Sequence, residues 1–309
     1  MKKTNQISLA ICLTSYALAA LYWLLTQVLK VNILGMQGFC TLYMVVPFVL
    51  VLIMMKKQEG RVSAASMGFS FRLNWTWLVA WLLPVLLVML AVWCSKNIFH
   101  LAVFSSMEDA SLEMVKDNPD LLAKTQAGID KLPMPMLGMT ALAGLLAGIT
   151  INAVFAFFEE SAWRGYLFKQ FKGQSFWKAT LYIGLIWGIW HAPVILMGHN
   201  YPAHPLAGVF MMILFCLAVT PIANYLRIKC RSAVAVAIFH GTVNALAGIG
   251  VIMAPSANDL LRGLPGLAGI MVVVVVDILL VLYDTFLSKD KAMGIISVEA
   301  LDADASTID

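Results

Sequence analysis

Long blocks of apolar residues alternate with short polar connections along the chain. Runs such as 75–94 and 266–287 hold about 20 mostly apolar residues, which at 1.5 Å per helical residue match the ~30 Å hydrocarbon core of a bilayer. The blocks are continuously apolar rather than alternating, which disfavours a β-barrel. The expected spans are residues 7–28, 33–55, 75–95, 136–162, 178–197, 205–226, 232–253 and 266–287. The pattern therefore predicts an all-α polytopic membrane protein with about eight transmembrane helices.

Composition supports this class. Hydrophobic residues make up 61% of the 309 residues and charged residues only 12%, about half the charge density of an ordinary soluble domain. We divide the chain into three parts. Residues 1–135 hold three transmembrane helices and an acidic outer loop, residues 136–253 a catalytic core of four transmembrane helices, and residues 254–309 the last helix and a polar cytoplasmic tail.

The basic residues predict the orientation. All but six of the 21 lysines and arginines fall at one set of helix ends. The six on the opposite side are Lys30, Lys96, Lys116, Lys124, Lys131 and Arg262. The richer side is expected to be cytoplasmic, so both termini are predicted inside. With a net charge of only +4 and no single basic patch, nucleic acid is not an expected partner. The chain is expected to be an integral protein of a bacterial plasma membrane.

The segment 96–135 is the one sizeable polar loop and carries six acidic residues. Its charge suits an outside location, and Ser105–Lys116 is predicted to form a surface helix. A solvated loop is the simpler interpretation, and a lid over a substrate site is the alternative.

Charged side chains inside a bilayer are costly unless paired or hydrated, so each marks a candidate functional site. The first group lies at the inner end of the fourth span, where residues 157–165 read FFEESAWRG. Residues four apart share a helix face, so Glu160 and Arg164 are predicted to pair. Glu159 points elsewhere and has no partner at that spacing, which leaves it available as a general base. The competing interpretation is a helix end where these charges simply meet water.

The second group is in the fifth span, where Trp187 lies one turn before His191 on the same face. Pro193 removes a backbone donor two residues later and is expected to kink the helix. A lone membrane histidine is more often a packing residue than a catalyst.

The third group is in the seventh span, where His240 and Asn244 are four residues apart. Both side chains can donate hydrogen bonds, so the pair suits a developing oxyanion. The alternative is a hydrogen-bonded pair that joins two helices.

Together the three groups supply a base, a histidine to orient it and an oxyanion clamp within one polar cavity. No serine or cysteine stands in a recognisable nucleophile motif, so attack by water on a peptide bond is expected. Counting from the inner helix ends places Glu159 and His240 within roughly 5–12 Å of the cytoplasmic boundary. This count predicts a cavity that opens toward the cytoplasm.

These motifs resemble those of the CAAX protease and bacteriocin-processing family, also called the Abi family, which includes the type II CAAX prenyl endopeptidase. They are Glu159-Glu160-x-x-x-Arg164, Trp187-x-x-x-His191 and His240-x-x-x-Asn244. The resemblance covers residues 136–250. It implies an eight-helix intramembrane endopeptidase of glutamate type that acts on a peptide or membrane-protein substrate.

By this resemblance Glu159, assisted by His191, activates water, and His240 with Asn244 binds the oxyanion. Glu160 and Arg164 support the site. The second motif usually begins with Phe, and here it begins with Trp187. The larger aromatic ring is expected to reshape the substrate cleft without abolishing the chemistry.

Three alternatives remain open, the first of which is a zinc-dependent version of the same enzyme. In one, Glu159, His191 and His240 bind zinc, although the sequence lacks HExxH and no cofactor is our first expectation. In another, a bacteriocin-immunity or regulatory protein binds a peptide or a sensor partner without cutting it. A transporter would use Glu159 and Asp277 as proton sites, but no inverted repeat is visible. The oligomeric state and the role of Asp277 are not indicated.

Overall fold

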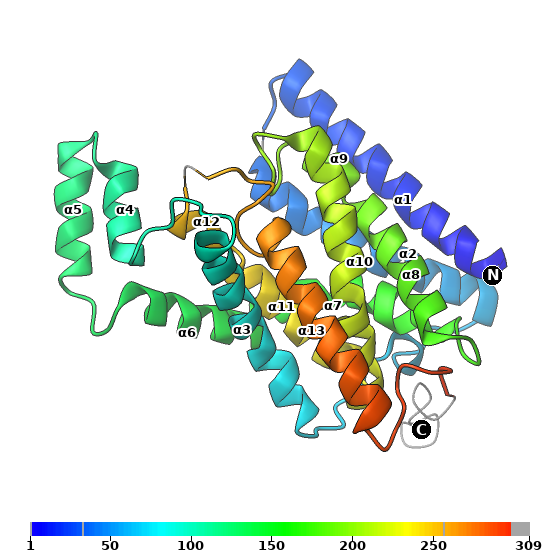
Figure 1. The fold of residues 1–309 in the computed structure, drawn as a ribbon. Coiled ribbons are helices and arrows are strands. Elements are labelled where there is room, and N and C mark those ends of the chain that lie inside the picture. Colours follow the sequence, from blue (N-terminus) through cyan, green and yellow to red (C-terminus); the bar gives the residue numbers. More distant parts are fainter. Residues whose placement is uncertain (1, 33, 256, 298–309) are drawn as a thin grey trace.

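The chain folds into a bundle of long helices (Figure 1). The computed structural model describes residues 2–32, 34–255 and 257–297. Within these ranges the only extended pairing is one isolated bridge between Ser175 and Ile295. The predicted all-α class is confirmed.

Seven helices or helix pairs are long and apolar enough to cross a membrane on their own. Each of them overlaps an expected span. They are α1 (Lys2–Trp23) with its π-helical extension η1 (Leu24–Val28), α2 (Gly35–Glu59), α3 (Thr76–Asn97), α8 (Phe176–Trp190) with α9 (Ala192–Leu196), α10 (Pro205–Cys230), α11 (Ala233–Leu246) with α12 (Gly248–Met253), and α13 (Leu267–Phe286).

The fourth expected span, 136–162, is broken rather than continuous. It consists of α6 (Met136–Ile149), then α7 (Ile151–Glu160) and its π-helical continuation η3 (Ser161–Leu167), with a bend of 50° at Thr150. Both halves pack on α11. Gly148 of α6 lies against Thr242, and Gly241 of α11 lies against the backbone at Asn152 of α7. The bend lets the two halves approach the same helix along different directions.

The polar loop forms a helical hairpin of α4 (Met107–Val115) and α5 (Pro119–Ile129), which projects from the side of the bundle (Figure 1). The side chains of Ser106 and Asn118 cap the two helices by accepting from backbone N–H groups, as N-cap residues do. The predicted surface helix is confirmed as α4. The second helix was not predicted, although Asn118 followed by Pro119 is a usual start signal.

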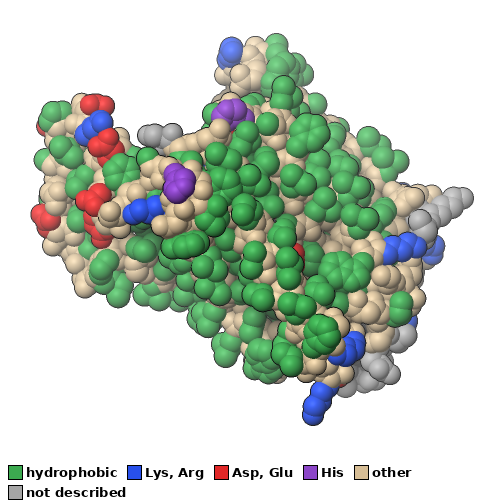
Figure 2. Space-filling model, viewed as in Figure 1, with side chains coloured by type: hydrophobic (Ala, Val, Ile, Leu, Met, Phe, Trp, Pro, Cys, Tyr) green, Lys and Arg blue, Asp and Glu red, His purple; other side chains and the backbone are tan. Residues whose placement is uncertain are grey.

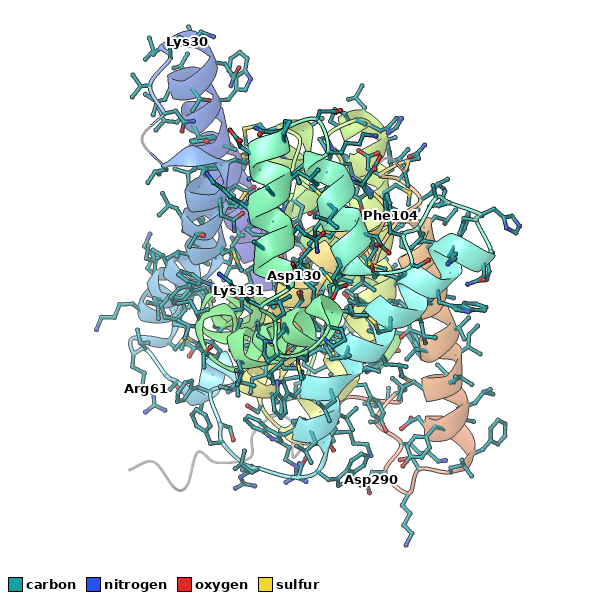
Figure 3. The ribbon with its side chains drawn as sticks, turned by 90° about the vertical axis from the view of Figure 1, so that its left-hand side faces the viewer. Lys30, Arg61, Phe104, Asp130, Lys131 and Asp290 are labelled. Carbon is teal, nitrogen blue, oxygen red and sulfur yellow. The ribbon has the colours of Figure 1, made fainter. Side chains whose placement is uncertain are left out.

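The two ends of the bundle are distinct. Lys30 lies at one end, and Arg61 and Asp290 lie at the other (Figure 3). At this second end residues 289–297 are docked rather than free: Phe176 N–H donates to Gly294 O, and Ile296 N–H donates to Gln174 O. The rest of the predicted tail lies outside the described residues. The division into parts at 135/136 and 253/254 stays a prediction.

Close packing of α7 on α11 depends on Gly241. A Cβ atom at this position would lie 2.7 Å from the backbone carbon of Asn152. Gly241→Ala is therefore expected to lower the free energy of unfolding by about 1–3 kcal/mol, the usual cost of overpacking. Denaturation in detergent micelles measures this change in the free energy of unfolding. Gly248→Ala is the matched control, because a Cβ there meets nothing within 4 Å; equal effects of the two substitutions would contradict the packing argument.

Candidate active site

The end of α7 and the whole of η3 are buried at the centre of the bundle. Glu159 is 2% exposed, and Glu160 and Arg164 are fully buried. Arg164 Nη1 donates to Glu160 Oε1 at 3.0 Å, so the predicted i,i+4 pair is confirmed. The competing interpretation, in which these charges meet water at a helix end, is wrong. π-Helical turns such as η3 are frequent at functional sites.

Arg164 is held from three sides. Its Nη2 donates to Thr220 Oγ1 of α10 at 3.2 Å, and its guanidinium lies 4.3 Å from the centre of the Trp187 ring. Its backbone carbonyl accepts from Arg227 Nε at 2.9 Å. Because a buried charge is stable only when paired and hydrogen-bonded, this set of contacts fixes the cation and the carboxylate beside it.

His240 is joined to the same carboxylate. Its Nδ1 lies 2.9 Å from Glu160 Oε1, so one oxygen serves both Arg164 and His240. A carboxylate on Nδ1 fixes the orientation of the ring, as second partners of functional histidines do. It also leaves Nε2 as the nitrogen that can meet a substrate. This contact joins α11 to α7 and was not predicted.

Glu159 has a partner that helix spacing did not reveal. The indole Nε1 of Trp187 in α8 donates to Glu159 Oε2 at 2.8 Å. The residue that departs from the family pattern therefore contributes a hydrogen-bond donor that Phe lacks. Its ring also lies 5.7 Å from the ring of His191 and 5.4 Å from that of His240, so Trp187 connects all three motifs.

His191 directly follows the last residue of α8 and precedes α9, so the helix is interrupted just before Pro193, where a kink was predicted. Its Nδ1 lies 2.8 Å from the carbonyl oxygen of Trp187. A carbonyl only accepts, so Nδ1 carries the proton and Nε2 carries a lone pair in the neutral ring. Cys216 Sγ lies 3.8 Å from the same Nδ1. The structure brings His191 to the site beside Trp187, without a direct hydrogen bond from Glu159 to it in the described part of the chain.

One cavity of about 280 Å³ collects the candidate residues. The four predicted catalytic residues all line it, and Glu160 and Trp187 do too. None of its lining residues comes from α4 or α5, so the polar loop does not line the cavity in the structure, and the lid stays an untested alternative. The lining residues that sequence reasoning missed include Gln37, Cys40, His199, Asn200 and Cys216.

The cavity extends toward the end of the bundle that is poor in Lys and Arg. Gln37 at the start of α2 and His199 and Asn200 between α9 and α10 lie at this end. The prediction of a cavity that opens on the Lys- and Arg-rich side is therefore wrong. Burial lowers the pKa of His199, so the mouth presents a neutral imidazole at pH 7.

The zinc alternative requires a group of ligands that are close enough together to bind one metal ion. In the part of the chain that the structure describes, no group of three or more His, Cys, Asp and Glu side chains is arranged to hold a metal ion. Glu159 Oε2 and His240 Nδ1 are each already bonded to a protein group.

Comparison with known proteins confirms the family prediction. Residues 137–246 match the family model described as Type II CAAX prenyl endopeptidase Rce1-like, and this range holds every candidate residue. Over 95 residues the chain is 32% identical to a CAAX prenyl protease 2 of Methanococcus maripaludis. That match covers 29% of this chain and 35% of the relative, so the chain spans about a third of the length of the curated relative it matches.

Proposed function

With residues 137–246 placed in the type II CAAX prenyl endopeptidase family, we propose that this integral membrane protein is an intramembrane endopeptidase. The observation that carries the proposal is the single cavity lined by Glu159, His191, His240 and Asn244. The first lies on α7, the second at the end of α8 and the others on α11. These side chains are the types needed to activate water and to stabilise an oxyanion.

In the proposed reaction Glu159 takes a proton from a water molecule as the water oxygen attacks the peptide carbonyl carbon. The lone pair on His191 Nε2 accepts the water's second hydrogen and orients it. His240, through Nε2, and Asn244, through its amide, donate to the oxyanion that forms. The carbon–nitrogen bond then breaks, and Glu159 returns the proton to the leaving amine.

Glu160 and Arg164 act through His240. The carboxylate on Nδ1 favours the protonated imidazole, which is the form that donates from Nε2. Arg164 fixes this carboxylate from the opposite side. The pair is therefore proposed as support for the oxyanion clamp, whereas Glu159 performs the proton transfer.

The test of the function is a map of peptide ends. Membrane peptides from cells that carry the wild-type chain are compared by mass spectrometry with those from cells that carry Glu159→Ala at equal expression. A set of ends present only with the wild-type chain is the expected result. Identical sets would contradict the proposal and favour a non-cleaving immunity or regulatory protein.

Trp187→Phe tests the indole hydrogen bond. The variant keeps an aromatic ring but removes the donor to Glu159 Oε2. A hydrogen bond to a charged group is worth about 1.5–3 kcal/mol, so cleavage is expected to slow by about tenfold or more. Trp177→Phe is the matched control, because Trp177 lies on the same helix and is 45% exposed. Equal rates for both variants would show that the indole does not position Glu159.

Cys216→Ser tests whether the Cys216 thiol, rather than water, is the nucleophile. The thiol lies beside His191, but the nitrogen that faces it carries a proton directed to the Trp187 carbonyl. This nitrogen cannot take a proton from the thiol, so cleavage is expected to stay within about threefold of wild type. A loss as large as that caused by changes at Glu159 would instead assign covalent catalysis to the thiol.

The proposed mechanism needs no metal ion. The zinc alternative would use Glu159, His191 and His240 as ligands. Metal analysis of the purified protein, together with cleavage after chelation, distinguishes the two: unchanged cleavage in metal-free protein is expected, and loss restored by zinc would favour the alternative.

A further inference from the structure

The direction from which a substrate reaches the site follows from how the cavity is closed at one end. The Lys- and Arg-rich end is sealed beneath Glu159 and Glu160. Every residue of η3 is buried, and the connection after α2 packs directly on it: a Cβ on Gly165 would lie 2.2 Å from Met67 O.

The same connection is fastened to the start of α11. Ala233 N–H donates to Gly68 O at 2.8 Å, and Ser232 Oγ donates to Ser70 O at 2.6 Å. Among the described residues, close contacts with the backbone of residues 67–70 therefore pack this connection against η3 and the start of α11, on the side of Glu159 and Glu160 away from the mouth.

The opposite end of the cavity is open. Gln37 and Asn200 line the cavity and are exposed. The ring of Phe48 packs at 5.3 Å from that of Phe158, beside Glu159. Gln37 stands eleven residues before Phe48 on α2, so the mouth lies about 16 Å above the site at 1.5 Å per residue.

The charges at the two ends of the bundle are unequal. Only six of the 21 Lys and Arg residues lie on the side of the mouth, namely Lys30, Lys96, Arg262 and, in and beside the acidic hairpin α4–α5, Lys116, Lys124 and Lys131. In Figure 2 acidic side chains gather over this hairpin together with some basic ones, and further Lys and Arg side chains appear at the right and at the bottom of the face, where no acidic cluster accompanies them. Connections rich in Lys and Arg stay in the cytoplasm, so the mouth belongs to the other side.

We propose that the site takes its substrate from the non-cytoplasmic face of the membrane. The substrate would be a polypeptide segment presented on that face, such as an exported peptide or the outer part of a membrane-anchored protein. Apart from the site carboxylates, the lining is largely uncharged and includes Met44, Met212 and Phe215. A segment with apolar, uncharged residues around the scissile bond fits it. The inference about the orientation of the mouth does not depend on the proposed function, whereas the inference about the substrate class rests on it.

Cysteine accessibility tests the orientation in the full-length chain. Asn200→Cys and Gln37→Cys place a thiol at the mouth, and Lys57→Cys places one at the exposed opposite end of α2. A membrane-impermeant polyethylene-glycol maleimide is applied to spheroplasts and to inverted membrane vesicles. The wild-type chain sets the background from its own cysteines.

Both mouth variants are expected to gain one modified band in spheroplasts and none in inverted vesicles, and Lys57→Cys the reverse. Modification of the mouth variants only in inverted vesicles would overturn the proposal. Protection of both from both sides, with Lys57→Cys still modified, would also overturn it, because the mouth would then be closed.

The map of peptide ends tests the substrate class. Ends that depend on Glu159 are expected to lie in segments on the non-cytoplasmic side of the membrane. Glu159-dependent ends confined to cytoplasmic segments would refute this inference and leave the protease function standing. No Glu159-dependent ends at all would refute the function, while the accessibility result would still decide the orientation.

Discussion

Glu159→Gln is expected to slow peptide cleavage by roughly 10²–10⁴-fold, the usual contribution of a general base. The amide has the size of the carboxylate, and its oxygen can still accept from Trp187 Nε1. It cannot take a proton from water, so the loss would be chemical rather than structural. The rate is measured with purified protein on a peptide taken from the map of cellular ends, and the thermal unfolding midpoint checks the fold.

Glu59→Gln is the matched control for that substitution. Glu59 is an exposed carboxylate at the end of α2, away from the cavity, and its loss should leave the rate unchanged. Cleavage by Glu159→Gln at the wild-type rate would assign the base to another group. A non-cleaving binder would tolerate both Glu159→Gln and Asn244→Ala, whereas the proposed enzyme tolerates neither.

The sequence predicted what depends on neighbours along one helix. Apolar length located the seven helices or helix pairs that are long enough to cross a membrane, and the bent pair α6–α7. The i,i+4 rule paired Glu160 with Arg164. Both rules need only the geometry of a single helix. The bend at Thr150 depends instead on how closely two glycines let α6 and α7 approach α11, which no local pattern encodes.

In the site, too, contacts between helices could not be predicted from the pattern of a single helix. The motifs identified which side chains meet in one cavity, but not how they bond. The Glu160–His240 and Trp187–Glu159 contacts each join two helices, and their atoms are set by the register between those helices. The wrong prediction of the cavity's opening has a similar origin, because counting depth from the helix ends says nothing about the connection at Met67 that packs against η3.

The buried ion pair should matter most for stability. Arg164 and Glu160 are both completely buried and lie 3.0 Å apart. Removing one partner of such a pair leaves an uncompensated charge, which costs about 3–5 kcal/mol. Arg164→Ala is therefore expected to lower the free energy of unfolding by about that amount, measured by denaturation in detergent micelles.

A double variant distinguishes the effect of the Glu160–Arg164 ion pair from the effect of the other contacts that Arg164 makes. Replacing both partners with neutral residues of similar size, Glu160→Gln with Arg164→Met, removes the isolated charge. This variant should be more stable than either single change, because a buried pair returns little net stability beyond the cost of desolvating it. The exposed pair Lys116–Glu113 supplies the control: Lys116→Met should leave the unfolding midpoint unchanged, since solvent screens exposed charges. Additive losses in the double variant would mean that Arg164 stabilises the bundle through Thr220 and Trp187 rather than through the carboxylate.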